Sequence, residues 1–195
     1  MRPELVFEFP ARYELVFHDR IPREAALPVL ELPAGIHADQ QQELALAPII
    51  EVRPAVGSRW IGLFFAEDRA NVRGTLIGWP DEESLCFFGG GGAYLVRSSD
   101  PAQITLIEGG PVLQQYYVVP TERVVLFADW TNIVAYDHAG VLWQSKRLAL
   151  DNVVIEAVDG GVIACSGFFG GSSERFTVDL RTGATIDAPW TFGDD

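Results

Sequence analysis

The fold is decided by one stretch, Val134-Ala135-Tyr136-Asp137-His138-Ala139-Gly140-Val141-Leu142-Trp143, which predicts two short strands joined by a tight turn. Apolar residues of strand length stand on both sides of the turn, and Asp137 and Gly140 mark its ends. An aspartate in a turn accepts hydrogen bonds from nearby backbone amides, and glycine takes a positive φ without strain. We therefore expect Asp137 to bond the turn that ends at Gly140, and Trp143 to be buried against a neighbouring β unit.

Similar apolar runs continue on both sides of this stretch, separated by Gly, Pro, Asp and Asn, which is typical of antiparallel β structure. The predicted strands from residue 60 onward are 60–66, 72–79, 84–88, 93–97, 103–107, 112–119, 124–128, 133–137, 141–148, 153–158, 162–168 and 175–180. No long window has helical periodicity, and the best helical candidate is 39–46, just before Pro48. The predicted fold class is all-β, built from antiparallel meanders.

A repeat underlies these runs. Leu85–Gly89, Val125–Asp129 and Ile163–Gly167 recur at spacings of 40 and 38 residues, and Phe176–Gly183 repeats the turn motif without its tryptophan. A period of this length is typical of a four-stranded propeller blade. Over residues 84–187 the pattern resembles the blades of quinoprotein and WD-type β-propellers.

The resemblance implies an architecture and no activity. A closed propeller needs about four to eight blades, and the chain contains fewer recognisable units, so we expect an incomplete propeller or stacked sheets. The stretch Phe127–Leu150 also resembles a group of uncharacterised bacterial proteins, which implies no mechanism.

The first 58 residues differ from the rest because they contain seven prolines, which cannot donate to a sheet ladder. Alternating apolar residues predict two early strands, Glu4–Phe9 and Tyr13–Phe17, paired as a hairpin. We expect residues 1–58 to pack on the repeat region 59–195, so that 1–195 forms a single β domain.

The charge is strongly negative, with 14 Lys and Arg against 27 Asp and Glu, a net charge of −13. Nucleic acid and anionic membranes would be repelled. The start of the chain lacks the features of a secretory signal, and no apolar run reaches the ~18 residues of a membrane span, so we expect a cytoplasmic protein. Cys86 and Cys165 lie in apolar runs and are interpreted as buried free thiols.

Neither a metal nor a cofactor is expected. The three histidines are scattered, none stands at ligand spacing from another histidine or a cysteine, and no nucleotide fingerprint is present. The glycine run 89–92 lacks the residues of a phosphate-binding loop and is interpreted as a hairpin loop.

Aspartates at the predicted strand ends are the candidates for acid and base chemistry, because two of them on one rim could act on a sugar. The candidate catalytic residues are Asp129, Asp137, Asp151 and His138, with Asp159 and Asp179 at further strand ends. Turn capping explains each aspartate equally well. Trp130 is in a loop and could stack on a ligand, whereas Trp60, Trp79 and Trp143 are expected in the core.

Three functions remain open. The leading hypothesis is a non-catalytic cytoplasmic binding protein that presents an acidic surface with exposed aromatic residues to a protein partner, for which a basic partner is the natural complement. The alternative is a hydrolase acting on a carbohydrate-like substrate through rim aspartates, with Trp130 as the stacking platform. The third is a structural or oligomerising unit that uses open sheet edges.

Overall fold

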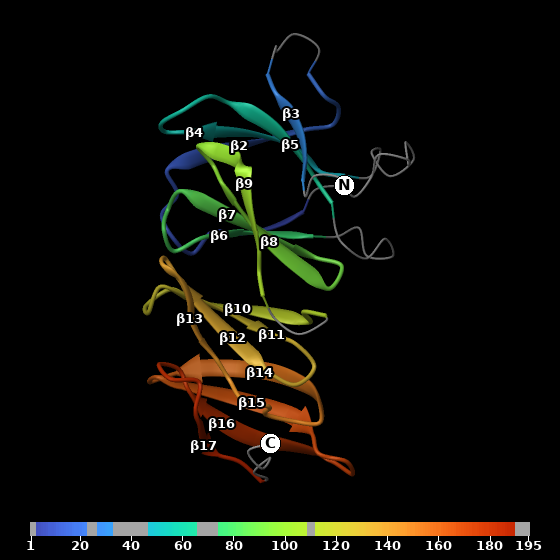
Figure 1. Cartoon of the computed structure of the whole chain (residues 1–195), viewed down its shortest axis with the longest axis vertical. Coiled ribbons are helices and arrows are strands. Elements are labelled where there is room, and N and C mark those ends of the chain that lie inside the picture. Colours follow the sequence, from blue (N-terminus) through green and yellow to red (C-terminus); the bar gives the residue numbers. More distant parts are fainter. Residues whose placement is uncertain (1–2, 23–26, 33–46, 66–73, 109–111, 190–195) are drawn as a thin grey trace. The chain divides into compact units, whose positions relative to one another are not determined.

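The computed structural model describes residues 3–22, 27–32, 47–65, 74–108 and 112–189. The chain divides into two compact units, Met1–Ile107 and Glu108–Asp195, and each is described by itself (Figure 1). Every regular element in the described ranges is a β-strand, which confirms the all-β prediction. The predicted helix at 39–46 lies outside the described residues, and the assignment of 1–195 to one domain stays a prediction.

Unit 1 contains two sheets, and the larger one is a four-stranded meander with a fifth strand added at its edge. In spatial order its strands are β1 (Glu4–Val6), β6 (Thr75–Gly78), β7 (Ser84–Gly89), β8 (Gly92–Arg97) and β9 (Asp100–Leu106). Strands β6 to β9 are antiparallel neighbours in chain order, whereas β1 joins β6 in a parallel pair with Glu4 opposite Thr75.

The second sheet of unit 1 is built from the N-terminal part of the chain. Its strands, in spatial order, are β2 (Tyr13–His18), β4 (Ile49–Pro54), β5 (Trp60–Phe64) and β3 (Val29–Leu32). The predicted hairpin of Glu4–Phe9 with Tyr13–Phe17 is therefore wrong, because β1 and β2 belong to different sheets. Pro10 between them cannot donate to a ladder, and each strand buries more surface in a larger sheet than in an isolated hairpin.

The two sheets of unit 1 share a core. Trp60 and Phe64 from β5 lie in the same cluster of buried side chains as Phe87 and Tyr94 from the larger sheet, with Phe64 and Phe87 ring centroids 5.7 Å apart. The Trp60 indole N–H donates to the carbonyl of Ser98 at 2.7 Å. The sheets therefore pack face to face, and a tryptophan bonds across the junction.

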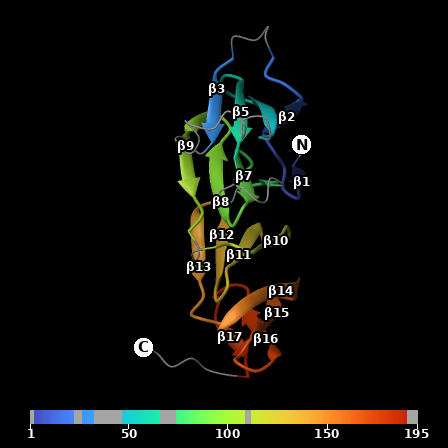
Figure 2. The ribbon, with the colours of Figure 1, turned by 90° about the vertical axis from the view of Figure 1, so that its right-hand side faces the viewer.

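Unit 2 consists of two consecutive four-stranded meanders, which Figure 2 shows as separate sheets. The first is β10 (Gln115–Val119), β11 (Val124–Ala128), β12 (Ile133–Asp137) and β13 (Gly140–Gln144). The second is β14 (Asp151–Asp159), β15 (Val162–Phe168), β16 (Ser173–Asp179) and β17 (Thr185–Asp187). The repeat found in the sequence falls on the second strand of each meander, β7, β11 and β15. The sheets of the described residues do not form a closed propeller.

Trp143 joins the two meanders of unit 2. Its side chain is 9% exposed and belongs to a core cluster with residues of both sheets. The indole N–H donates to the carbonyl of Leu180 at 2.8 Å. Gly183 has a φ of +70°, and a Cβ there would lie 2.4 Å from the Trp143 ring. The predicted burial of Trp143 against a neighbouring β unit is confirmed.

The turn chemistry also agrees with the sequence. The Oδ1 of Asp137 accepts a hydrogen bond from the amide of Ala139 at 2.7 Å, and Gly140 has a φ of +127°. The glycine run is a hairpin loop in which Gly89 pairs with Gly92, and the two glycines between them have positive φ as in a type I′ turn. Both cysteines are free and buried.

Replacing Trp143 with alanine removes a large side chain from the core and leaves the Leu180 carbonyl without its donor. We expect the free energy of unfolding to fall by about 3–5 kcal/mol. The measurement is chemical denaturation of Trp143→Ala, with Trp130→Ala as the matched control because Trp130 is 40% exposed. Equal losses in the two variants would show that Trp143 does not join the sheets.

Candidate functional site

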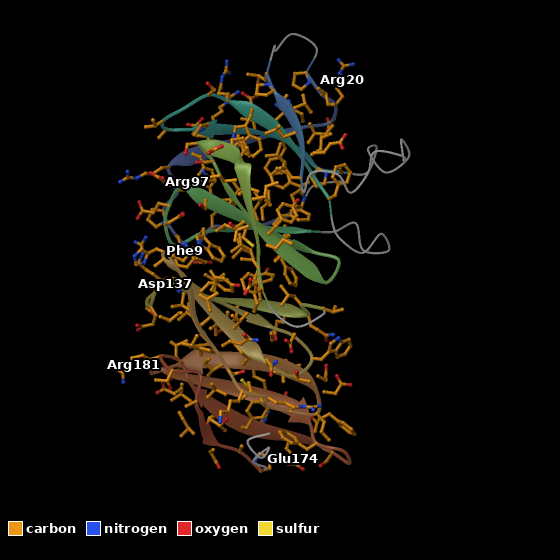
Figure 3. All side chains as sticks on the ribbon, in the orientation of Figure 1. Phe9, Arg20, Arg97, Asp137, Glu174 and Arg181 are labelled. Atoms are coloured by element: carbon orange, nitrogen blue, oxygen red, sulfur yellow. The ribbon has the colours of Figure 1, made fainter. Side chains whose placement is uncertain are left out.

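Four tight turns meet at one end of unit 2, two from each meander. They are Pro120–Arg123 between β10 and β11, Asp137–Gly140 between β12 and β13, Asp159–Val162 between β14 and β15, and Asp179–Gly183 between β16 and β17. We call this the four-turn end. Figure 3 labels Asp137 and Arg181 on the same side of the unit, and Glu174 away from them.

A groove with a volume of about 400 Å³ opens at the four-turn end. Its apolar lining comes from Val124, Leu142, Val162 and Leu180. Its rim comes from Glu122, Gly160, Gly161, Asp179 and Arg181. Both sheets therefore contribute to the groove, which combines an apolar floor with charged side chains at its edge.

Leu142 reaches the groove because of a β-bulge. Along the β12–β13 ladder Ala135 pairs with Trp143 and Tyr136 pairs with Val141, so Leu142 has no partner. A bulge of this kind redirects side chains that strict alternation would place elsewhere. Trp143 consequently points into the core, while Leu142 is 44% exposed and lines the groove.

Asp179 on the rim holds its own turn in place. Its Oδ1 accepts hydrogen bonds from the amide of Arg181 at 3.0 Å and from the amide and the hydroxyl of Thr182, each at 2.8 Å. The Thr182 hydroxyl bond, followed by the amide bonds and the Arg181 charge, lowers the pKa of Asp179 below its ordinary value. Asp179 therefore keeps a negative charge on the rim at neutral pH.

The predicted catalytic aspartates lie at both ends of unit 2. Asp129 follows β11 at the end opposite the four-turn end, and Asp137 follows β12 at the four-turn end, so the length of β12 separates them. Asp129 is 3% exposed, and its Oδ1 accepts hydrogen bonds from the amides of Thr131 and Asn132 at 2.6 and 2.7 Å. Asp129 acts as a buried turn cap.

Of the other candidates, Asp159, Asp179 and His138 share the four-turn end with Asp137, whereas Asp151 does not. Asp151 begins β14 at the end with Asp129, and its Oδ1 accepts a hydrogen bond from the amide of Asn152. Trp130 is exposed at that same end and is not part of the groove. His138 is exposed in the turn after Asp137. A glycosidase needs two carboxylates across one substrate. Asp129 and Asp137 lie at opposite ends of β12 and cannot form such a pair, while an acid–base role for the aspartates that share the four-turn end stays a prediction.

Sequence reasoning missed a charged cluster in unit 1, centred on Glu51 of β4. Glu51 is 4% exposed, and its carboxylate accepts hydrogen bonds from Arg53 at 2.8 and 3.3 Å and from Arg59 at 3.3 Å, with His18 Nε2 3.1 Å away. The Arg53 hydrogen bond lowers the pKa of Glu51 most, and the His18 bond and the arginine charges add to it despite burial. The carboxylate is fully engaged, which indicates a structural role.

Comparison with known proteins finds no family model that matches the chain and no match among curated proteins. Within the described ranges, no group of three or more His, Cys, Asp or Glu residues is arranged to hold a metal ion. A search of the same residues for a helix long and apolar enough to cross a membrane also finds none.

Removing the buried cap Asp129 leaves the Thr131 and Asn132 amides without their acceptor. We expect Asp129→Ala to lower the free energy of unfolding by about 1–3 kcal/mol, as for other unsatisfied buried groups. Asp137→Ala is the matched control and should cost less, because its turn is exposed and water replaces the carboxylate. Thermal denaturation of both variants tests this, and a larger loss in Asp137→Ala would contradict the assignment.

The Glu51 cluster predicts a dependence of stability on pH. Because the folded-state pKa of Glu51 lies below its ordinary value of 4.5, the cluster stabilises the fold above that pH. Its contribution is lost as the pH falls through the lowered pKa. We expect Glu51→Gln to lose less stability than the wild type between about pH 5 and pH 3 in denaturant titrations. The exposed Glu8→Gln serves as control, and a wild-type slope in Glu51→Gln would refute the prediction.

Proposed function

We propose that this chain is a non-catalytic binding protein that presents the four-turn end of unit 2 to a basic protein partner. The observation that carries the proposal is the groove, which has an apolar floor and carboxylates at its edge. Protein interfaces combine an apolar centre with a polar rim, and the groove has this arrangement on a small scale. The turns around it are held by their own hydrogen bonds, so little order has to be gained on binding.

Charge favours a basic partner. The four-turn end carries four carboxylates, Glu122, Asp137, Asp159 and Asp179, against two arginines, Arg123 and Arg181. Unit 2 as a whole has twelve Asp and Glu against five Lys and Arg, a net charge of −7. A negative field of this kind raises the rate at which positively charged proteins meet the surface and disfavours acidic ones.

The irregular edge strands β13 and β17 favour contact with a partner through the turns over contact by strand addition. In β13 the bulge leaves Leu142 unpaired, and in β17 Ile186 has no partner, because Thr177 pairs with Asp187 and Val178 with Thr185. Irregular edge strands are a common protection against pairing with another chain. An oligomer built by joining these edges is therefore disfavoured.

We also propose that the meanders are related in architecture to the blades of quinoprotein and WD-type propellers. Each of the three meanders β6–β9, β10–β13 and β14–β17 has four antiparallel strands in chain order, and tight turns cluster at the strand ends. In this proposal the meanders are blades, and the turns at their ends form the binding surface, since loops on a rigid scaffold commonly carry function.

Photo-crosslinking in the native host tests the proposal. A photoreactive residue replaces Ala139, which is exposed in the four-turn end, or Gly171 as the control in the β15–β16 turn at the other end. A Cβ at Gly171 meets no atom within 4 Å, so this control is compatible with the fold. We expect position 139 to capture a basic protein, with a yield that falls between about 50 and 200 mM salt.

Two results would contradict the proposal. One is capture from position 171 alone. The other is capture of acidic partners at position 139 with a yield that salt does not change.

A further inference from the structure

The floor of the groove fits side chains of a peptide. Leu142 is 44% exposed and lines the groove together with the buried Val124 and Leu180, which are 4% and 5% exposed. The volume of about 400 Å³ is near the lower end of the range of small-ligand sites, roughly 300–1,000 Å³. Nothing on this floor offers a charged group, so the part of a ligand that enters it is aliphatic.

The rim adds a requirement for positive charge. Among the described residues, the three hydrogen bonds that the Asp179 side chain accepts all end on Oδ1, which leaves Oδ2 for a ligand. Glu122 is exposed on the part of the rim that the first meander, β10–β13, contributes, whereas Asp179 belongs to the second meander. Arg181 offsets one of these two carboxylates, and Asp137 in the neighbouring turn extends the negative region. An anionic ligand is repelled, and a cation beside the aliphatic group is attracted.

We infer that the groove receives an aliphatic side chain of a partner segment in which the adjacent residue is arginine or lysine, whose cation contacts Asp179 or Glu122. This inference rests on the proposed function and specifies the chemistry that the partner presents. A second copy of this chain is a poorer occupant, because the chain carries a net charge of −13 and would repel itself.

The probe is a short fluorescein-labelled peptide in which leucine alternates with arginine, measured by fluorescence anisotropy against the full chain. Two control peptides separate the apolar contribution to affinity from the charge contribution. One has serine in place of each leucine, and the other has glutamine in place of each arginine. We expect each control to bind at least about tenfold more weakly, since a lost apolar contact or charge pair changes affinity by that order.

Variants of the chain locate the contact. Leu142→Ser removes part of the floor at an exposed position that pairs with no strand. Gly160→Asn narrows the groove and keeps the turn, because asparagine tolerates the φ of +55° found there and no atom lies within 4 Å of a Cβ. We expect both to weaken binding about tenfold, and Glu122→Gln to reduce its salt dependence. Phe168→Ser, exposed at the other end, is the control and should bind as the wild type.

Methyl NMR of the full chain distinguishes binding at the groove floor from binding elsewhere on unit 2. The leucine–arginine peptide should shift the methyl signals of Leu142, Val124 and Val162. Equal binding of the serine peptide at these residues overturns the inference and leaves the acidic four-turn end as the binding surface. Shifts confined to Leu150, at the opposite end, overturn both the inference and the proposed function. No binding at about 1 mM peptide overturns the inference, while crosslinking from position 139 decides the proposed function independently.

Discussion

The two meanders of unit 2 depend on an indole placed where they meet. Trp143 buries its ring among side chains of both sheets, and its N–H donates to the carbonyl of Leu180. The ring occupies the space that a side chain at Gly183 would need, so the turn after β16 is shaped around it. A flat aromatic ring with one donor at its edge suits this position, because it provides a large apolar area and satisfies one buried carbonyl.

Unit 1 uses the same device with different residues. Trp60 bonds the carbonyl of Ser98, which follows the third strand of the β6–β9 meander, as Leu180 follows the third strand of the β14–β17 meander. In both units the indole N–H of a tryptophan in one sheet donates a hydrogen bond to a turn carbonyl of the neighbouring sheet. The glycine and aspartate of the surrounding turns differ between the units, which indicates that the indole contact is more general than the turn motif.

Local pairing explains how much of the fold could be predicted from the sequence. The predicted strands 124–128, 133–137 and 162–168 coincide with β11, β12 and β15, because each strand of a meander pairs with its neighbour in the chain. Pairing in the N-terminal part spans long separations, as in β1 with β6, and periodicity contains no information about such partners. The exposure of Leu142 could not be predicted, because a bulge breaks the alternation of β13. The Glu51 cluster could not be predicted either, because an isolated acidic residue in an apolar strand forms no recognisable motif.

Leu180 belongs to the core and also lines the groove, so the groove is coupled to the stability of the fold. Its carbonyl accepts the Trp143 hydrogen bond, while the same residue lines the groove. A substitution that alters the floor at this position therefore also perturbs the packing of the two sheets. Glu122 and Arg181 stand in exposed turns outside that packing. Substitutions at these two rim positions can therefore change the charge at the edge of the groove without disturbing the packing beneath it.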